Sequence, residues 1–156
     1  MEEQFAQAIR GFFEQYGWQF QEEDGTFYSA VQLPQTSDGA LLRIVTDGVG
    51  VTVSAAFDRH LPEESLMDLI QAANLTNFLL STGAMYIDLS ERYAAFRIGA
   101  LYTKAPATSD DVAEQISYAI DMIERIALGL VGIGEEGWDV PKLVQTIMEL
   151  PEDEDA

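Results

Sequence analysis

The chain has 156 residues, 47% of them hydrophobic, which fits one globular domain with a substantial core. Twenty-seven Asp and Glu residues against eight Lys and Arg give a net charge of −19, which disfavours nucleic acid and anionic membranes as partners and favours a basic protein. The absence of cysteine excludes disulfides, thiolate nucleophiles and Cys-based zinc sites. Because residues 1–4 lack signal-peptide features and no apolar run approaches ~18 residues, we expect a cytoplasmic protein.

The first third of the chain predicts a helix followed by an antiparallel meander. In residues 2–16, aromatic and aliphatic side chains recur at helical spacing. Three Asp-Gly pairs, beginning at Asp24, Asp38 and Asp47, then separate alternating apolar runs, a pattern that indicates tight hairpin turns. The predicted strands are residues 18–21, 26–33, 40–46 and 49–57. They have one apolar face and one mixed face, as in a sheet that helices cover on one side.

The rest of the chain predicts two helices around a second hairpin. Pro62 and the acids after it begin a helix, whose expected inward positions are Leu66, Leu69, Ala73, Asn77 and Leu80. Residues 85–89 and 93–102 form the hairpin.

A capping box at Thr108 begins a third helix, which we expect to end in the glycine-rich stretch 129–137, before a short amphipathic helix over 141–150. The element order is α-β-β-β-β-α-β-β-α plus a C-terminal helix. It predicts an α+β fold with a single antiparallel sheet covered by helices on one face.

The stretch from Asn74 to Asp88, together with the aromatic first helix and the meander, resembles the YbjN-like family of sensory-transduction regulators and its fold relatives, the type III secretion chaperones. In that family an Asn-bearing helix likewise runs into the second hairpin, and a long closing helix follows. The resemblance implies a protein without catalytic residues. Its chaperone relatives form homodimers that hold extended segments of another protein on apolar surface. The fourth meander strand and residues 138–150 depart from the pattern, which leaves the mode of dimerisation open.

Three regions follow from this reading. Residues 1–131 are the expected α+β, chaperone-like domain. Residues 132–150 are a glycine-rich connector and an amphipathic helix, and residues 151–156 are an acidic disordered tail.

The motifs that could indicate an enzyme are weak. The glycines from Gly132 to Gly137 match the G-x-G-x-x-G dinucleotide pattern, but they follow a predicted helix and enclose two glutamates, which favours a flexible connector. His60 is the only histidine, and no G-x-S-x-G motif or metal-ligand spacing accompanies it. We therefore expect no enzyme activity, no cofactor and no metal site.

Six residues are candidates for contact with a partner. Asn77 lies among apolar residues, either as an amide bonded to backbone near Gly83 or as a polar anchor in an interface. Arg43 and Arg97 would project from the mixed strand face, either paired with neighbouring acids or free to bind an acidic group. The remaining candidates are Trp138, Leu143 and Ile147. These three would either fold back on the domain or present a helix to a partner.

We expect a homodimeric, non-enzymatic protein that holds another polypeptide, possibly a basic one, on an apolar surface framed by acidic charge. The alternative is a small-molecule sensor with a pocket between sheet and helices and Arg43 or Arg97 as the anchor.

Overall fold

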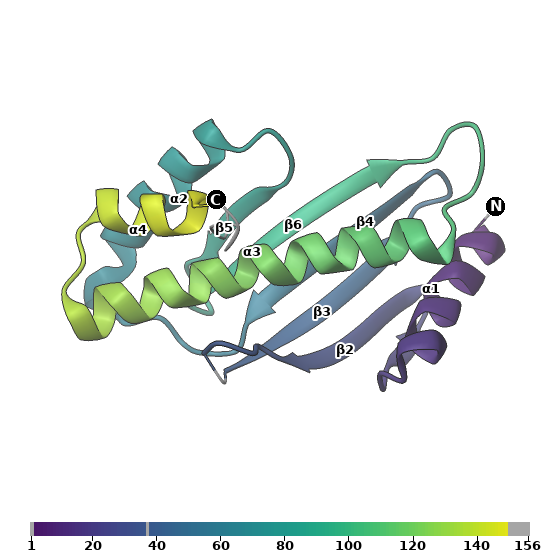
Figure 1. The fold of residues 1–156 in the computed structure, drawn as a ribbon, viewed down its shortest axis with the longest axis horizontal. Helices are drawn as coiled ribbons and strands as arrows, with labels where there is room; N and C mark the ends of the chain where they lie inside the picture. Colours follow the sequence, from purple (N-terminus) through teal and green to yellow (C-terminus); the bar gives the residue numbers. More distant parts are fainter. Residues whose placement is uncertain (1, 37, 150–156) are drawn as a thin grey trace, which may run out of the picture.

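The computed structural model describes residues 2–36 and 38–149. These residues form one six-stranded antiparallel sheet with helices on one face (Figure 1), which confirms the predicted fold class. The elements are α1 (Glu2–Tyr16), β1 (Gln21–Glu23), β2 (Thr26–Gln32), β3 (Gly39–Thr46), β4 (Gly50–Phe57), a 3-10 turn (Glu63–Ser65), α2 (Leu66–Leu79), β5 (Ala84–Asp88), β6 (Tyr93–Leu101), α3 (Ser109–Glu136) and α4 (Val140–Met148). The strand order is β1-β2-β3-β4-β6-β5. The predicted tail 151–156 lies outside the described residues.

Helix α1 packs with its aromatic face inward, and this packing also determines where β1 begins. Phe12 and Phe13 are buried. The ring centroid of Trp18 lies 5.3 Å from that of Phe12, and the ring of Phe20 stacks on that of Phe13 with 4.7 Å between the centroids. Because Trp18 and Phe20 are drawn against the helix, the strand begins only at Gln21. The prediction that the strand begins at residue 18 was therefore wrong.

The meander uses two of the three predicted Asp-Gly turns. Asp24 and Gly25 both have positive φ, 50° and 78°, and they join β1 to β2 as a tight two-residue turn. Gly48, with φ 92°, lies in the turn between β3 and β4. The third pair differs, because Gly39 is already the first residue of β3 and pairs with Gln32 across a longer loop.

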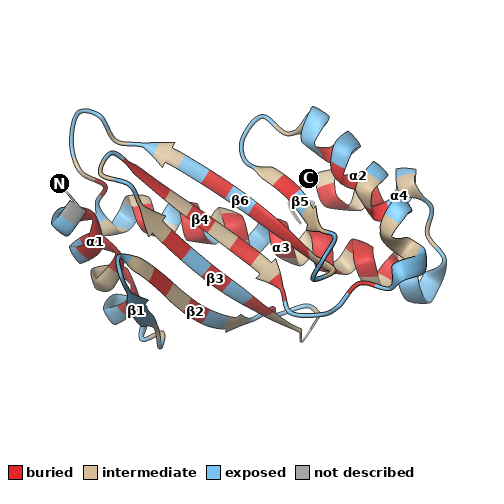
Figure 2. Cartoon of the chain, turned by 180° about the vertical axis from the view of Figure 1, so that it is seen from behind, coloured by how far each residue is buried: buried red, intermediate tan, exposed pale blue. Residues whose placement is uncertain are grey.

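Strand alternation divides the sheet into a covered face and an open face. In β4, every second residue from Val51 to Phe57 is buried beneath the helices, whereas Ser54 and Ala56 point the other way. Figure 2 shows this alternation along β2, β3, β4 and β6 from the side without helices. Helix α3 runs across the covered face in Figure 1 and contacts β4 and β6.

Helix α3 ends within the predicted stretch 129–137, but it includes residues 132–136, where a glycine-rich connector was expected. The helix continues to Glu136 and ends at Gly137, which adopts φ 67°. A Cβ atom added at Gly129 would overlap Leu143, and one added at Gly132 would overlap the indole of Trp138. These glycines allow α4 to approach α3 closely, so they serve packing and do not interrupt the helix.

Candidate functional site

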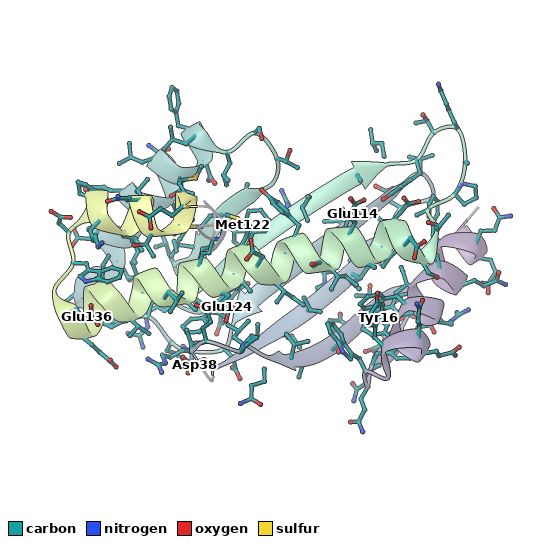
Figure 3. All side chains as sticks on the ribbon, viewed as in Figure 1. Tyr16, Asp38, Glu114, Met122, Glu124 and Glu136 are labelled. Carbon is teal, nitrogen blue, oxygen red and sulfur yellow. The ribbon has the colours of Figure 1, made fainter. Side chains whose placement is uncertain are left out.

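The candidate site is the open face of the sheet, whose four central strands have arginines as their only charged residues. The strands β2, β3, β4 and β6 contain no Asp or Glu, and Arg43 and Arg97 are their only charged side chains. Helix α3, on the covered face, has seven acids and one arginine. Figure 3 shows some of these acids along α3, including Glu114, Glu124 and Glu136. The central strands of the open face therefore present only positive charge, whereas Asp58 and Glu91 lie at the margin of that face.

Arg43 and Arg97 lie in one row across the open face. Ser54 of β4 pairs in register with Arg43 of β3 on one side and with Arg97 of β6 on the other. Two strand spacings separate the two arginines at their backbones, about 10 Å. We call Arg43, Ser54 and Arg97 the arginine row. The strand pairing therefore brings together two candidates that lie 54 positions apart in the sequence.

Both arginines of the row are exposed and lack an acidic partner within residues 2–36 and 38–149. Three other arginines are paired: Arg10 with Glu3 and Glu22, Arg59 with Asp38 at 2.9 Å, and Arg125 with Asp121 at 3.0 Å. Arg92, in the turn between β5 and β6, has no acidic partner among the described residues. The interpretation that Arg43 and Arg97 pair with neighbouring acids is thus wrong for this part of the chain. They also lie on the face away from the helices, so they cannot anchor a ligand between sheet and helices.

Two adjoining hollows cross the open face around the row. One, of about 610 Å³, is lined by Arg43, Ser54, Ala56, Tyr86 and Tyr93 and also by the acids Asp58 and Glu91. Arg97 lies beside this hollow and is not part of its lining. The other, of about 670 Å³, lies toward β1 and β2 and includes Tyr28 and Ala30. Leu41, which is 47% exposed, lines both hollows. We call the two together the open-face groove.

The polar groups at one end of the groove are structural in character. Asp88 accepts hydrogen bonds from the backbone N–H of Glu91 and from the backbone and hydroxyl of Ser90, and these bonds hold the pKa of Asp88 below its usual value. Burial, together with the nearby Tyr86 and Asp88, raises the pKa of Tyr93, which keeps its hydroxyl neutral. His60 has Nδ1 3.0 Å from the carbonyl of Glu91. This arrangement braces the turn between β5 and β6 and does not activate a nucleophile.

Asn77 braces the edge of the sheet. Its Nδ2 donates to the carbonyl of Met85, and its Oδ1 accepts from the N–H of Met85, both at 2.8 Å. The amide is thus bonded to backbone near Gly83, although much of the residue is exposed and it lies beside the inward positions of α2, not among them. The inward positions are Leu69, Ala72, Ala73 and Thr76. An interface role for Asn77 stays a prediction.

The last three candidates lie in and before α4. Leu143 and Ile147 are fully buried, and Trp138 covers Gly132 of α3. Helix α4 contacts α2 and α3, so it packs on the rest of the chain, which was one of the two alternatives for this segment. A partner-binding role for these side chains stays a prediction, and it would require α4 to leave this position.

The outer side of α2 is a second candidate surface that sequence analysis did not single out. Four of its apolar side chains are exposed, and we call them the α2 outer stripe: Met67 (68%), Leu75 (49%), Phe78 (87%) and Leu79 (56%). The sequence did contain a sign of this surface: apolar residues occur on all sides of α2, and Asp68 is its only charged residue.

Two features typical of other classes of protein are absent from the described residues: a cluster of metal-binding side chains and a membrane-spanning helix. Within 2–36 and 38–149, no three acidic or histidine side chains gather as a metal site would need. No helix in the same ranges has the length and apolar character to cross a membrane.

The sequence profile of the YbjN family, described as "Putative bacterial sensory transduction regulator", matches residues 6–130. This chain belongs to the YbjN family. The match extends from α1 into α3 and does not include α4. No curated protein matches the sequence.

Solved structures share the fold. The crystal structure of YbjN from E. coli matches with a TM-score of 0.61 at 11% identity, over 85% of this chain and 93% of that one. The structure of the HopA1–SchA chaperone–effector complex matches with a TM-score of 0.56 at 12% identity, over 80% and 92%. The type III secretion chaperone SycH of Yersinia pestis, in complex with a fragment of YscM2, gives 0.47 at 11% identity, over 75% and 94%. The predicted resemblance to YbjN and to the secretion-chaperone fold is thereby confirmed.

Proposed function

We propose that this YbjN-family protein is a non-enzymatic protein-binding module, chaperone-like or regulatory, that holds another polypeptide on an apolar surface framed by acidic charge. The supporting observation is the α2 outer stripe, in which the Phe78 side chain is 87% exposed. Isolated exposed apolar residues are ordinary, but a group of them on one helix is typical of an interaction surface. Asp68 and the acids Glu63 and Glu64 lie at the start of the helix, beside this stripe in sequence.

Burial of the stripe would supply the affinity. Fully covering one Phe, Leu or Met side chain stabilises a complex by about 1.5–3 kcal/mol, before the cost of ordering the interface. Phe78 has the most exposed area to lose, so it should dominate the binding energy, as large aromatic side chains do in other interfaces. The surrounding acids would favour a basic partner and would make the complex sensitive to salt.

The proposal includes a homodimer and a cytoplasmic location. The second copy would meet a surface other than the α2 outer stripe, because the polypeptide partner covers that stripe. A cysteine-free composition fits a reducing compartment.

The test compares Phe78→Ser with Asn74→Ser, a control at an exposed polar position of the same helix. We expect light scattering after size exclusion to give the mass of two chains for all three proteins, because the stripe binds the partner and not the second copy. Affinity capture from cell extract at low salt should recover a basic protein, released as salt rises, with the wild type and the control but not with Phe78→Ser. Equal capture by all three proteins, or capture that rising salt leaves unchanged, would contradict the proposal.

A further inference from the structure

We propose that the open-face groove is a second binding site, which takes an acidic polypeptide segment of a partner protein and pairs its carboxylates with Arg43 in the groove and with Arg97 beside it in the arginine row. This goes beyond the function proposed above, because it concerns the opposite charge and does not use α2. Four observations support it: the charge of the face, the unpaired state of the arginines, the row geometry and the shape of the groove.

The charge of the open face is the first observation. The chain has 27 acidic residues, yet none occurs in β2, β3, β4 or β6, where both charges are arginines. At physiological salt the Debye length is about 8 Å, so the acids of α3, on the other side of the sheet, are largely screened from a ligand on this face. Asp58 and Glu91 line the hollow near β5, so the positive field that a docked segment meets is local to the arginine row.

The unpaired arginines are the second observation. In a protein with more than three acids for each basic residue, Arg10, Arg59 and Arg125 have acidic partners. Arg43, Arg97 and the turn residue Arg92 have none in the part of the chain described, and only Arg43 and Arg97 lie together in one row of the sheet. A guanidinium binds a carboxylate through two parallel hydrogen bonds, which makes a free pair of arginines a specific receptor for acidic side chains.

The row geometry sets the spacing of the groups that are recognised. The backbones of Arg43 and Arg97 are about 10 Å apart, with the small Ser54 between them. Side chains that point to the same side of an extended segment recur about every 6.8 Å. Arginine side chains are long enough to adjust by a few ångströms, so acids two or four positions apart can reach both guanidinium groups.

The shape of the groove favours a polypeptide over a small molecule. Small-molecule sites enclose most of their ligand, whereas this face has no helix over it, as Figure 2 shows. The two hollows adjoin at Leu41 and extend from Gln21 of β1 to Tyr86 of β5, across the six strands. That width is about 24 Å, the length of about seven extended residues. Leu41, Ala56 and the tyrosines along it offer apolar contact between the charged positions.

The test uses a fluorescein-labelled ten-residue peptide in which Glu and Leu alternate, with a Gln–Leu peptide of the same length as the uncharged probe. Binding is measured by fluorescence anisotropy to the full chain and to Arg43→Gln, Arg97→Gln and the double variant. Lys104→Gln is the matched control, because it removes one positive charge from an exposed loop position outside the groove. Equal thermal midpoints of the variants confirm that each is folded.

We expect the Glu–Leu peptide to bind more tightly than the Gln–Leu peptide. Its Kd should rise about tenfold for each arginine removed and about a hundredfold in the double variant, while Lys104→Gln changes it less than twofold. Equal affinity for the two peptides, no binding of the Glu–Leu peptide at millimolar concentration, or an equal effect of Lys104→Gln would overturn the proposal. A changed oligomeric state in the double variant would also overturn it, because a second copy of the chain would then occupy the face.

Discussion

Substituting alanine for glycine at three positions of α3 separates a packing role from a connector role. Gly134 has open space around its Cβ position, a Cβ at Gly129 would meet the flexible end of Leu143, and one at Gly132 would meet the rigid indole of Trp138. Alanine in a helix is favoured over glycine by about 1 kcal/mol, so Gly134→Ala should stabilise the protein by roughly that amount. Inserting a methyl group into a packed contact costs about 1–3 kcal/mol.

At Gly132 the two effects oppose each other. The net change should lie between about zero and 2 kcal/mol of destabilisation, so Gly132→Ala should be less stable than Gly134→Ala by about 1–3 kcal/mol. Gly129→Ala should fall between them, because the Leu143 side chain can rotate away. The difference between variants is the decisive quantity, since the helix-propensity gain is common to all three.

Urea denaturation followed by tryptophan fluorescence and by circular dichroism measures these differences, and Trp138 reports directly on the contact. If Gly132→Ala proves as stable as Gly134→Ala, the close packing of Trp138 on α3 is refuted. If all three substitutions leave the stability unchanged, the stretch behaves as the connector that its glycine content suggested.

Three further predictions concern single contacts. Removing the capping box with Thr108→Ala should lower the free energy of unfolding by about 1 kcal/mol in urea denaturation, because the Asp111 N–H loses its acceptor; an unchanged midpoint would contradict this. Asn77→Ala should lower the free energy of unfolding in urea by about 1–2 kcal/mol, because it leaves the N–H and C=O of Met85 without partners. The matched Asn74→Ala should lower it by less than about 0.5 kcal/mol, and equal losses would refute the bracing role. Burial, followed by the nearby Asp111 and Glu114, raises the pKa of Tyr102 above its ordinary 10.0, so the stabilisation from its neutral hydroxyl is complete below pH 10 and is lost as pH rises through the folded pKa. The stability difference between the wild type and Tyr102→Phe should therefore shrink above pH 10, and a difference independent of pH would argue against this.

Strand alternation was sufficient to predict the open face and to place two of the candidates on it. The period of two residues puts Leu42 and Ile44 on one face and Arg43 on the other, and the structure has the same division. Alternation cannot reveal which strands are neighbours. The arginine row exists only because β6 pairs with β4, which brings Ser54 opposite Arg97.

The predictions for helices failed where tertiary contacts override local preference. Glycines lower helix propensity, so residues from Gly132 onward were predicted to be a connector. They are helical as far as Glu136, and Trp138 and Leu143 pack against the space that Gly132 and Gly129 leave. The α2 outer stripe was missed for a different reason. Apolar residues surround that helix, so periodicity cannot separate inward from outward positions, and only the packed structure does so.

The position of β6 between β4 and β5 has a consequence for how the chain folds. Val53 of β4 pairs with Ile98 of β6, 45 positions further along, so β4 lacks its second neighbour until the chain has been synthesised past α2 and β5. The cover of the sheet comes later still, because α3 begins only at Ser109. During synthesis, most of the chain therefore emerges with the apolar side of its meander exposed to water and to other chains. Such long-range contacts slow folding, and the last third of the sequence completes the core that the first third begins.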